Sequence, residues 1–145
     1  MPSPEENRFV AAVSVAIVRD GRVLLVRRGR EPSLGLYAFP GGRVEREETL
    51  EEAARRELTE ETALAAGRLA PYRTVRIEAA AAVGAPAFEL TVFAGDSAQG
   101  VLRAGDDADE AGWYSLEEMD TLPVIDSVAA IARELLGQGA RRSAG

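Results

Sequence analysis

The chain has 145 residues, which fits one domain, and its formal net charge of −7 disfavours non-specific nucleic-acid binding, because positive charge is what holds phosphate backbones. It contains no cysteine and no histidine, and each of its 17 basic residues is an arginine. These absences exclude a thiolate nucleophile, an imidazole base, a lysine Schiff base and zinc sites built on cysteine or histidine, which leaves carboxylates and a hard metal ion for catalysis.

The first third of the chain predicts a strand hairpin. Residues 9–18 form an apolar, β-branched run typical of a buried strand, and Asp20-Gly21 is a turn signal before a return strand over 23–26. A loop over 29–35 follows, and a short strand over 36–39 stops at Pro40-Gly41-Gly42.

The main helix is predicted over residues 50–62. Thr49 and Glu52 form a capping box at its start, and the residues inside it are strong helix formers. The segment 63–67 ends this helix, and two strands follow over 69–82 and 87–94.

The last third predicts an acidic loop over 105–110, a short strand over 112–114 and a short helix that begins at the capping box Ser115/Glu118. A final helix starts near Asp126 and places apolar residues at helical spacing. We expect residues 1–7 and 139–145 to be flexible. The order of elements predicts an α/β fold over 1–145, a single domain with a mixed β-sheet and helices on both faces.

Three acids carry the chemistry. Glu57, Glu60 and Glu61 stand at i, i+3 and i+4, within an arc of about 100° on one helix face. Carboxylates at this spacing repel one another unless a divalent cation binds them, and Mg²⁺ prefers such oxygen ligands. The alternative is an ordinary solvated acidic face. Gly41 can bring its backbone carbonyl close to a metal, because it has no side chain.

The segment 42–64 resembles the Nudix box, Gly-x5-Glu-x7-Arg-Glu-U-x-Glu-Glu-x-Gly-U, in which U is a bulky aliphatic residue. The box has a glycine where this chain has Ala63, so the end of the helix is expected to be altered. The flanking Leu-Leu-Val-Arg-Arg, Phe-Pro-Gly-Gly and Trp-Tyr-Ser-Leu-Glu-Glu segments are also similar to this family. The matching positions are Gly42, Glu48, Arg56, Glu57, Leu58, Glu60, Glu61 and Leu64.

The resemblance implies a Nudix-type α/β/α sandwich and a metal-dependent hydrolase. It implies that Glu57, Glu60, Glu61 and the Gly41 carbonyl bind Mg²⁺ or Mn²⁺, and that Glu57 or Glu61 orients the attacking water. Gly42, Glu48 and Arg56 are expected to be structural, with an ion pair between Glu48 and Arg56 joining loop to helix.

Further candidates lie outside the box. The family often takes an added acid from a late loop, and Asp107 is the first choice for that base, ahead of Asp106 and Glu110; a plain hydrophilic loop is the alternative. Arg27 and Arg28 end a strand and are candidates for binding substrate phosphate. Because neighbouring strand residues face opposite sides, we favour Arg28 as the inward one.

The expected substrate is a nucleoside diphosphate derivative, with ADP-ribose or a related sugar as the best choice, since the late acidic segment is similar to ADP-ribose pyrophosphatase-like members. Cleavage of a nucleoside triphosphate to the monophosphate and pyrophosphate is the alternative, and a non-catalytic nucleotide-sensing domain is the second. The isomerase relatives need a cysteine, and RNA decapping is disfavoured by the acidity.

The remaining expectations concern partners and compartment. No apolar run reaches the roughly 18 residues needed to cross a bilayer, so no membrane partner is expected. The N-terminal residues do not form a secretory signal, which indicates a cytoplasmic protein. A homodimer is possible.

Overall fold

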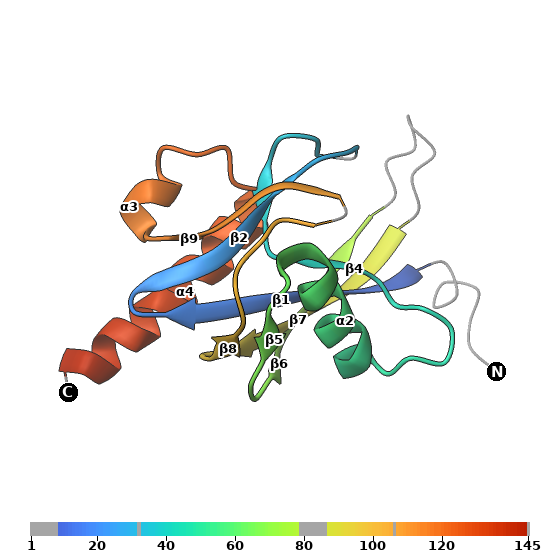
Figure 1. The fold of residues 1–145 in the computed structure, drawn as a ribbon, viewed down its shortest axis with the longest axis horizontal. Helices are drawn as coiled ribbons and strands as arrows, with labels where there is room; N and C mark the ends of the chain where they lie inside the picture. The colour runs from blue at the N-terminus through green and yellow to red at the C-terminus, as the bar shows by residue number, and fades with distance from the viewer. Residues whose placement is uncertain (1–8, 32, 79–86, 106, 145) are drawn as a thin grey trace.

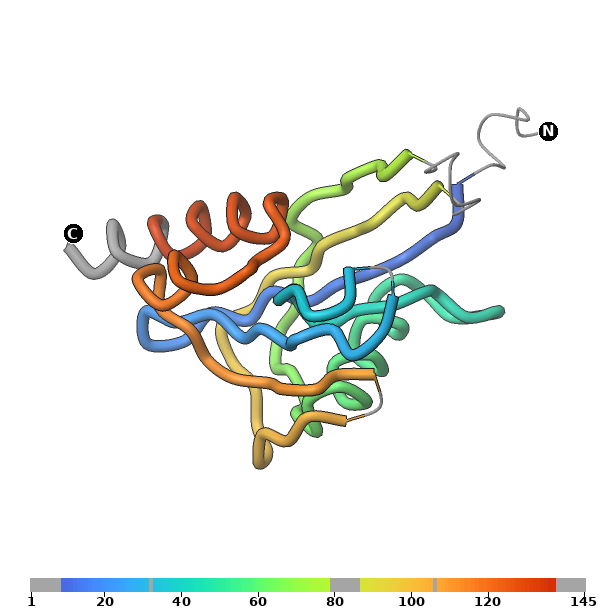
Figure 2. The backbone as a smooth tube through the Cα atoms, turned by 90° about the horizontal axis from the view of Figure 1, so that it is seen from above, coloured from blue at the N-terminus to red at the C-terminus, as the bar shows by residue number. Residues whose placement is uncertain are grey.

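The computed structural model describes residues 9–31, 33–78, 87–105 and 107–144, and the side chains up to residue 137. Two helices, α2 (Leu50–Thr62) and α4 (Asp126–Ala144), lie on opposite faces of a mixed sheet (Figures 1 and 2). The predicted α/β sandwich with helices on both faces is therefore confirmed. The expected flexible segment 1–7 lies outside the described residues.

Strand β1 (Phe9–Arg19) lies at the centre of the sheet. The Asp20-Gly21 turn, with both residues at positive φ, returns the chain into the antiparallel β2, as predicted. On its other side β1 pairs in parallel with β7, which makes the sheet mixed. Within the described residues the strand order is β3-β2-β1-β7-β6, with β4 on β1 and β9 on β2. The bounds are β2 Arg22–Arg28, β3 Tyr37–Ala38, β4 Gly41–Arg43, β6 Ala70–Ile77, β7 Ala87–Gly95 and β9 Ala108–Tyr114.

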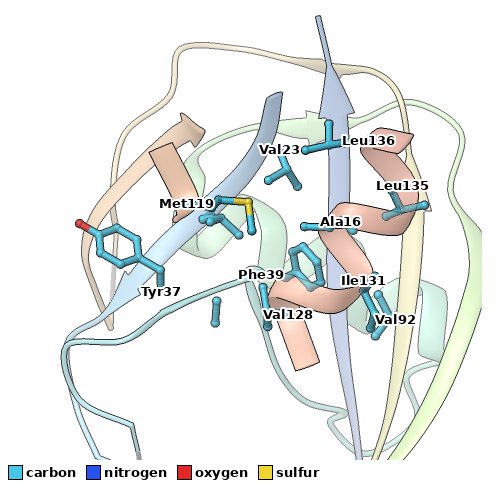
Figure 3. Packing of buried hydrophobic residues seen from close by; sticks show 13 residues of the cluster. Ala16, Val23, Tyr37, Phe39, Val92, Met119, Val128, Ile131, Leu135 and Leu136 are labelled. Atoms are coloured by element: carbon cyan, nitrogen blue, oxygen red, sulfur yellow. The ribbon is translucent and has the colours of Figure 1, made fainter. Parts of the chain in front are cut away.

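The core has two layers, one on each face of the sheet. Beneath α2, the helix residues Ala53, Ala54 and Leu58 pack against alternate residues of β1 such as Val15 and Ile17. On the other face, α4 packs its apolar residues against β1, β2 and β7 (Figure 3). The α4 residues in this layer are those predicted from helical spacing: Val128, Ile131, Leu135 and Leu136.

Local signals set the helix starts. Thr49 accepts a hydrogen bond from the Glu52 amide and Glu52 accepts one from the Thr49 amide, so the predicted capping box is confirmed. The second box, Ser115 with Glu118, is confirmed at α3 (Leu116–Met119). None of the helices in the described part of the chain is long and apolar enough to cross a membrane.

Other predicted boundaries need correction. Strand β9 begins at Ala108, so the acidic loop expected over 105–110 ends in a strand that pairs with β2. Strand β4 and the small sheet of β5 (Ala65–Ala66) with β8 (Ala98–Gln99) were not predicted, because such short strands have no periodic pattern. Helix α4 is helical to Ala144, while flexibility of 139–145 stays a prediction.

Candidate active site

The three acids of α2 differ in their surroundings. The Glu57 side chain is 13% exposed, whereas that of Glu60 is 42% exposed. Glu57 lies against Gly42, where a Cβ atom on the glycine would come within 2.5 Å of its Oε1 atom. Strand β4 therefore approaches α2 so closely that a side chain at residue 42 would have to displace the Glu57 carboxylate.

Arg56 holds the loop before α2. Its Nε and Nη2 atoms lie 2.6 and 2.9 Å from the two oxygens of Glu48, and Nη2 also donates to the Arg43 carbonyl at 3.1 Å. The expected ion pair is thus present. The hydrogen bonds from Arg56 and from the Glu45 amide lower the pKa of Glu48 to about 2. Both side chains are about one-fifth exposed, so water screens this pair only partly.

The same guanidinium also contacts two of the three acids. Its Nη1 atom lies 2.8 Å from Glu57 Oε1 and 3.2 Å from Glu60 Oε2. Burial nevertheless raises the pKa of Glu57, because the loss of hydration outweighs the attraction of Arg56. Arg56 therefore stabilises this group of acids only in part.

Glu61 also contacts β4, at the neighbouring glycine. The Gly41 amide donates to its Oε2 atom at 3.3 Å, a contact that joins residues far apart in the sequence. Burial raises the pKa of Glu61 to about 8, and the negative charges of Glu57 and Asp107 act in the same direction. The Gly41 hydrogen bond and the Arg28 charge oppose that increase. In the absence of a cation, the surroundings of Glu61 therefore disfavour its ionised form.

The charges of Asp107 and Arg28 both act on the Glu61 carboxylate. Asp107 accepts a hydrogen bond through its carbonyl from the Gly29 amide at 2.7 Å, and its carboxylate pairs with Arg30. Arg27 is exposed and lies next to Tyr37 in the strand register, on the α4 face. The geometry thus favours Arg28 over Arg27 as the inward cation.

Of the other two candidates for the added acid, Asp106 lies outside the described residues. Glu110 accepts a hydrogen bond of 2.6 Å from the Tyr37 hydroxyl on the α4 face of the sheet, and its role as the added acid stays a prediction. Tyr37 itself packs edge-on against Tyr114, with ring centroids 5.5 Å apart.

Sequence reasoning missed Arg30 and Gly105. Gly105 donates to the Glu61 carbonyl at 3.1 Å, and a Cβ atom there would lie 2.5 Å from the Glu60 carbonyl oxygen. The turn residue Gly105 carried a signal of its own, since glycine tolerates close backbone approach. Arg30 carried none, because it is one of many arginines and its partner lies far along the chain.

The carboxylate oxygens of Glu57, Glu60 and Glu61 are chemically suited to bind a divalent cation. Carboxylate oxygens are the ligands of Mg²⁺ and Mn²⁺. Burial raises the pKa of Glu57 and of Glu61, and a bound cation would favour the ionised form of both. In the arrangement described, Arg56 holds Glu57 and Glu60, and no group of three or more acids among the described residues converges on one point. A single cation bound by all three acids would therefore require these side chains to turn. At Gly41 the observed contact with Glu61 is through the amide, not the carbonyl.

Fold and site together define an α/β/α sandwich in which α2 presents partly buried carboxylates to the glycines of β4. The NUDIX domain pattern matches residues 8–136, and the chain belongs to the Nudix family.

Individual relatives agree with this assignment. The chain is 38% identical over 114 residues to the ADP-ribose pyrophosphatase of Methanocaldococcus jannaschii, covering 77% of this chain and 64% of that protein. It is 34% identical over 130 residues to the NAD-capped RNA hydrolase NudC of Edwardsiella ictaluri, covering 89% of this chain and 47% of that protein. The chain thus spans roughly half to two-thirds of the length of these relatives.

Solved structures show the same fold. The MutT NUDIX hydrolase from Burkholderia pseudomallei superposes with a TM-score of 0.76 at 31% identity, over 86% of this chain and 95% of that chain. The NUDIX domain of Shewanella oneidensis NrtR, solved with ADP ribose, has a TM-score of 0.74 at 22% identity, over 97% and 93% of the two chains.

Proposed function

We propose that this chain is a Mg²⁺-dependent hydrolase that uses water to cleave the diphosphate linkage of a nucleoside diphosphate derivative. The observation that carries the proposal is the pair of partly buried carboxylates, Glu57 and Glu61, on one helix against the glycines of β4. Withdrawing two neighbouring acids from water is costly in a structural role and useful in a cation site.

Each residue has a distinct task in this proposal. A bound divalent cation would neutralise the diphosphate and acidify a water molecule. Glu57, Glu60 and Glu61 would hold that cation, and Glu61 or Asp107 would accept the proton of the attacking water. Arg28 would bind a phosphate oxygen, and the Glu48–Arg56 pair would keep the loop and helix in register.

ADP-ribose is the first choice of substrate. The support is the 38% identity to the archaeal ADP-ribose pyrophosphatase, together with the late acidic segment already noted. NAD contains the same diphosphate linkage between two nucleosides, so the similarity to NudC is consistent with this substrate class. Triphosphate cleavage is the alternative, because the chain is also 30% identical over 105 residues to an oxidised purine nucleoside triphosphate hydrolase of Danio rerio.

The test is a substrate panel at fixed protein concentration. ADP-ribose, an ADP-sugar, NAD, ATP, CTP and an oxidised purine triphosphate are incubated with Mg²⁺, with Mn²⁺ and with chelator, and products are separated by chromatography. We expect AMP from ADP-ribose with metal and no product with chelator. Pyrophosphate release from triphosphates alone would instead support the alternative. Binding without turnover would support the nucleotide-sensing domain.

Two substitutions test the roles of the acids. Glu57→Gln and Glu61→Gln should each lower turnover by about a hundredfold or more, the scale of one lost catalytic group, while the fold is retained. Asp107→Asn should have a smaller effect. Glu117→Gln, in the exposed first turn of α3, is the matched control and should retain activity. Near-normal activity of the Glu57 or Glu61 variant would refute its assigned role.

A further inference from the structure

The segment before β9 is fixed to the last turn of α2. The Gly105 amide donates to the Glu61 carbonyl at 3.1 Å, and the Arg103 amide donates to the Thr62 carbonyl at 2.9 Å. Carbonyls at the end of a helix have no partner within the helix, so these contacts use groups that are otherwise unsatisfied. They place the backbone leading to Asp107 beside the acidic end of α2.

A second contact holds Asp107 from the opposite side. The Gly29 amide, at the end of β2, donates to the Asp107 carbonyl at 2.7 Å. A Cβ atom at Gly29 would lie 2.8 Å from Asp109 Oδ1 and 2.9 Å from the Asp107 carbonyl oxygen. The backbone after β2 is therefore packed directly against the start of β9. The backbone of Asp107 is therefore held between α2 and the loop after β2.

Backbone contacts leave the side-chain torsions of Asp107 free, and half of this side chain is exposed. Its carboxylate forms an ion pair with Arg30, the first residue after Gly29 in the same loop. The residue that fixes the backbone of Asp107 and the residue that pairs with its carboxylate are thus neighbours in sequence. A motion of this loop would displace both contacts together.

We propose that Arg30 is a positioning residue, which orients the Asp107 carboxylate towards the acidic end of α2 for the reaction. This inference rests on the proposed function, and in particular on a role for Asp107 in the hydrolytic step. Arg30 acts through Asp107, with which it forms an ion pair. Its side chain is 65% exposed, so the pair contributes little to the stability of the fold.

The expected effect of Arg30→Gln is therefore kinetic. We expect kcat for ADP-ribose to fall about two- to fivefold, the range that coupling through one exposed ion pair spans, with KM nearly unchanged. Arg30→Lys should recover part of this loss, since lysine keeps the charge without the planar fork. In the Asp107→Asn background, Arg30→Gln should have no further effect on kcat.

The matched control is Arg133→Gln, which removes a similarly exposed ion pair between Arg133 of α4 and Asp120 at the end of α3. Its kcat should equal that of the unaltered protein, and unchanged melting temperatures of all variants would show that each one folds.

Four results would overturn the inference. They are a rise in KM alone, a full additional loss of kcat in the Asp107→Asn background, equal kcat for Arg30→Gln and the control, and no recovery with lysine. Absence of turnover in the unaltered protein on the whole panel would refute the proposed function and this inference together.

Discussion

Ala63 provides the sharpest test of how backbone geometry affects stability here. It ends α2 with φ 64° and ψ 10°, in the left-handed region, and its amide donates to the Thr59 carbonyl at 2.9 Å. An alanine in this conformation is disfavoured by about 1–2 kcal/mol, because its Cβ atom approaches the following carbonyl oxygen. Glycine has no such atom, but it loses about 0.5–1 kcal/mol more conformational entropy on folding.

The two effects leave a net gain for Ala63→Gly. We expect the free energy of unfolding to rise by about 0.5–1 kcal/mol, which corresponds to an increase in melting temperature of about 2–3 °C for a chain of this size. The assay is urea unfolding, monitored by circular dichroism and by the fluorescence of Trp113. An unchanged dependence of the unfolding free energy on urea concentration would confirm two-state behaviour in both proteins.

The control makes the same substitution in a right-handed helix. Ala130 is exposed within α4, and Ala130→Gly should lower the free energy of unfolding by about 1 kcal/mol. Because the two positions differ in the sign of φ, the two substitutions should change the free energy of unfolding in opposite directions. A loss of stability in Ala63→Gly similar to that of the control would refute the reasoning, because the left-handed penalty would then be absent.

Three further predictions concern the site. Gly42→Ala should displace the Glu57 carboxylate and lower turnover with little loss of stability, whereas Gly41→Ala should lower the melting temperature, because its Cβ atom would meet the backbone of β1. In chelator, the free energy of unfolding should fall by at most about 1.4 kcal/mol per pH unit as pH rises from about 4.3 to about 8, because folded Glu61 keeps its proton in that interval and unfolded Glu61 loses it. The Glu61→Gln variant should not show this fall. Equal pH profiles for the variant and the unaltered protein would contradict the prediction. Glu48 has a lowered pKa, so its contribution to the free energy of unfolding is present above about pH 4 and is lost as pH falls towards 2. In urea unfolding at pH 7, the Glu48→Gln variant should therefore have a lower free energy of unfolding than the unaltered protein. This difference should vanish as pH falls to about 2 and below.

The sequence alone determined the features that depend on a few neighbouring residues. Both capping boxes, the Asp20-Gly21 turn and the helical spacing of the α2 acids are local, because the groups involved lie within four residues of one another. The family resemblance predicted more of the fold than the local rules did, because it implied that the acids of the main helix and Gly41 lie close together around one metal ion.

Only the tertiary structure decided which acids are buried and what they contact. Glu61 differs from Glu60 because it accepts a hydrogen bond from the Gly41 amide. Asp107 differs from Glu110 because its carbonyl accepts a hydrogen bond from the Gly29 amide, whereas the Glu110 carboxylate accepts one from the Tyr37 hydroxyl on the α4 face. These contacts join segments that meet through the pairing of β4 with β1 and the pairing of β2 with β9. Burial and charge act through space, so a pattern along the chain locates the acidic helix but not the surroundings of each carboxylate.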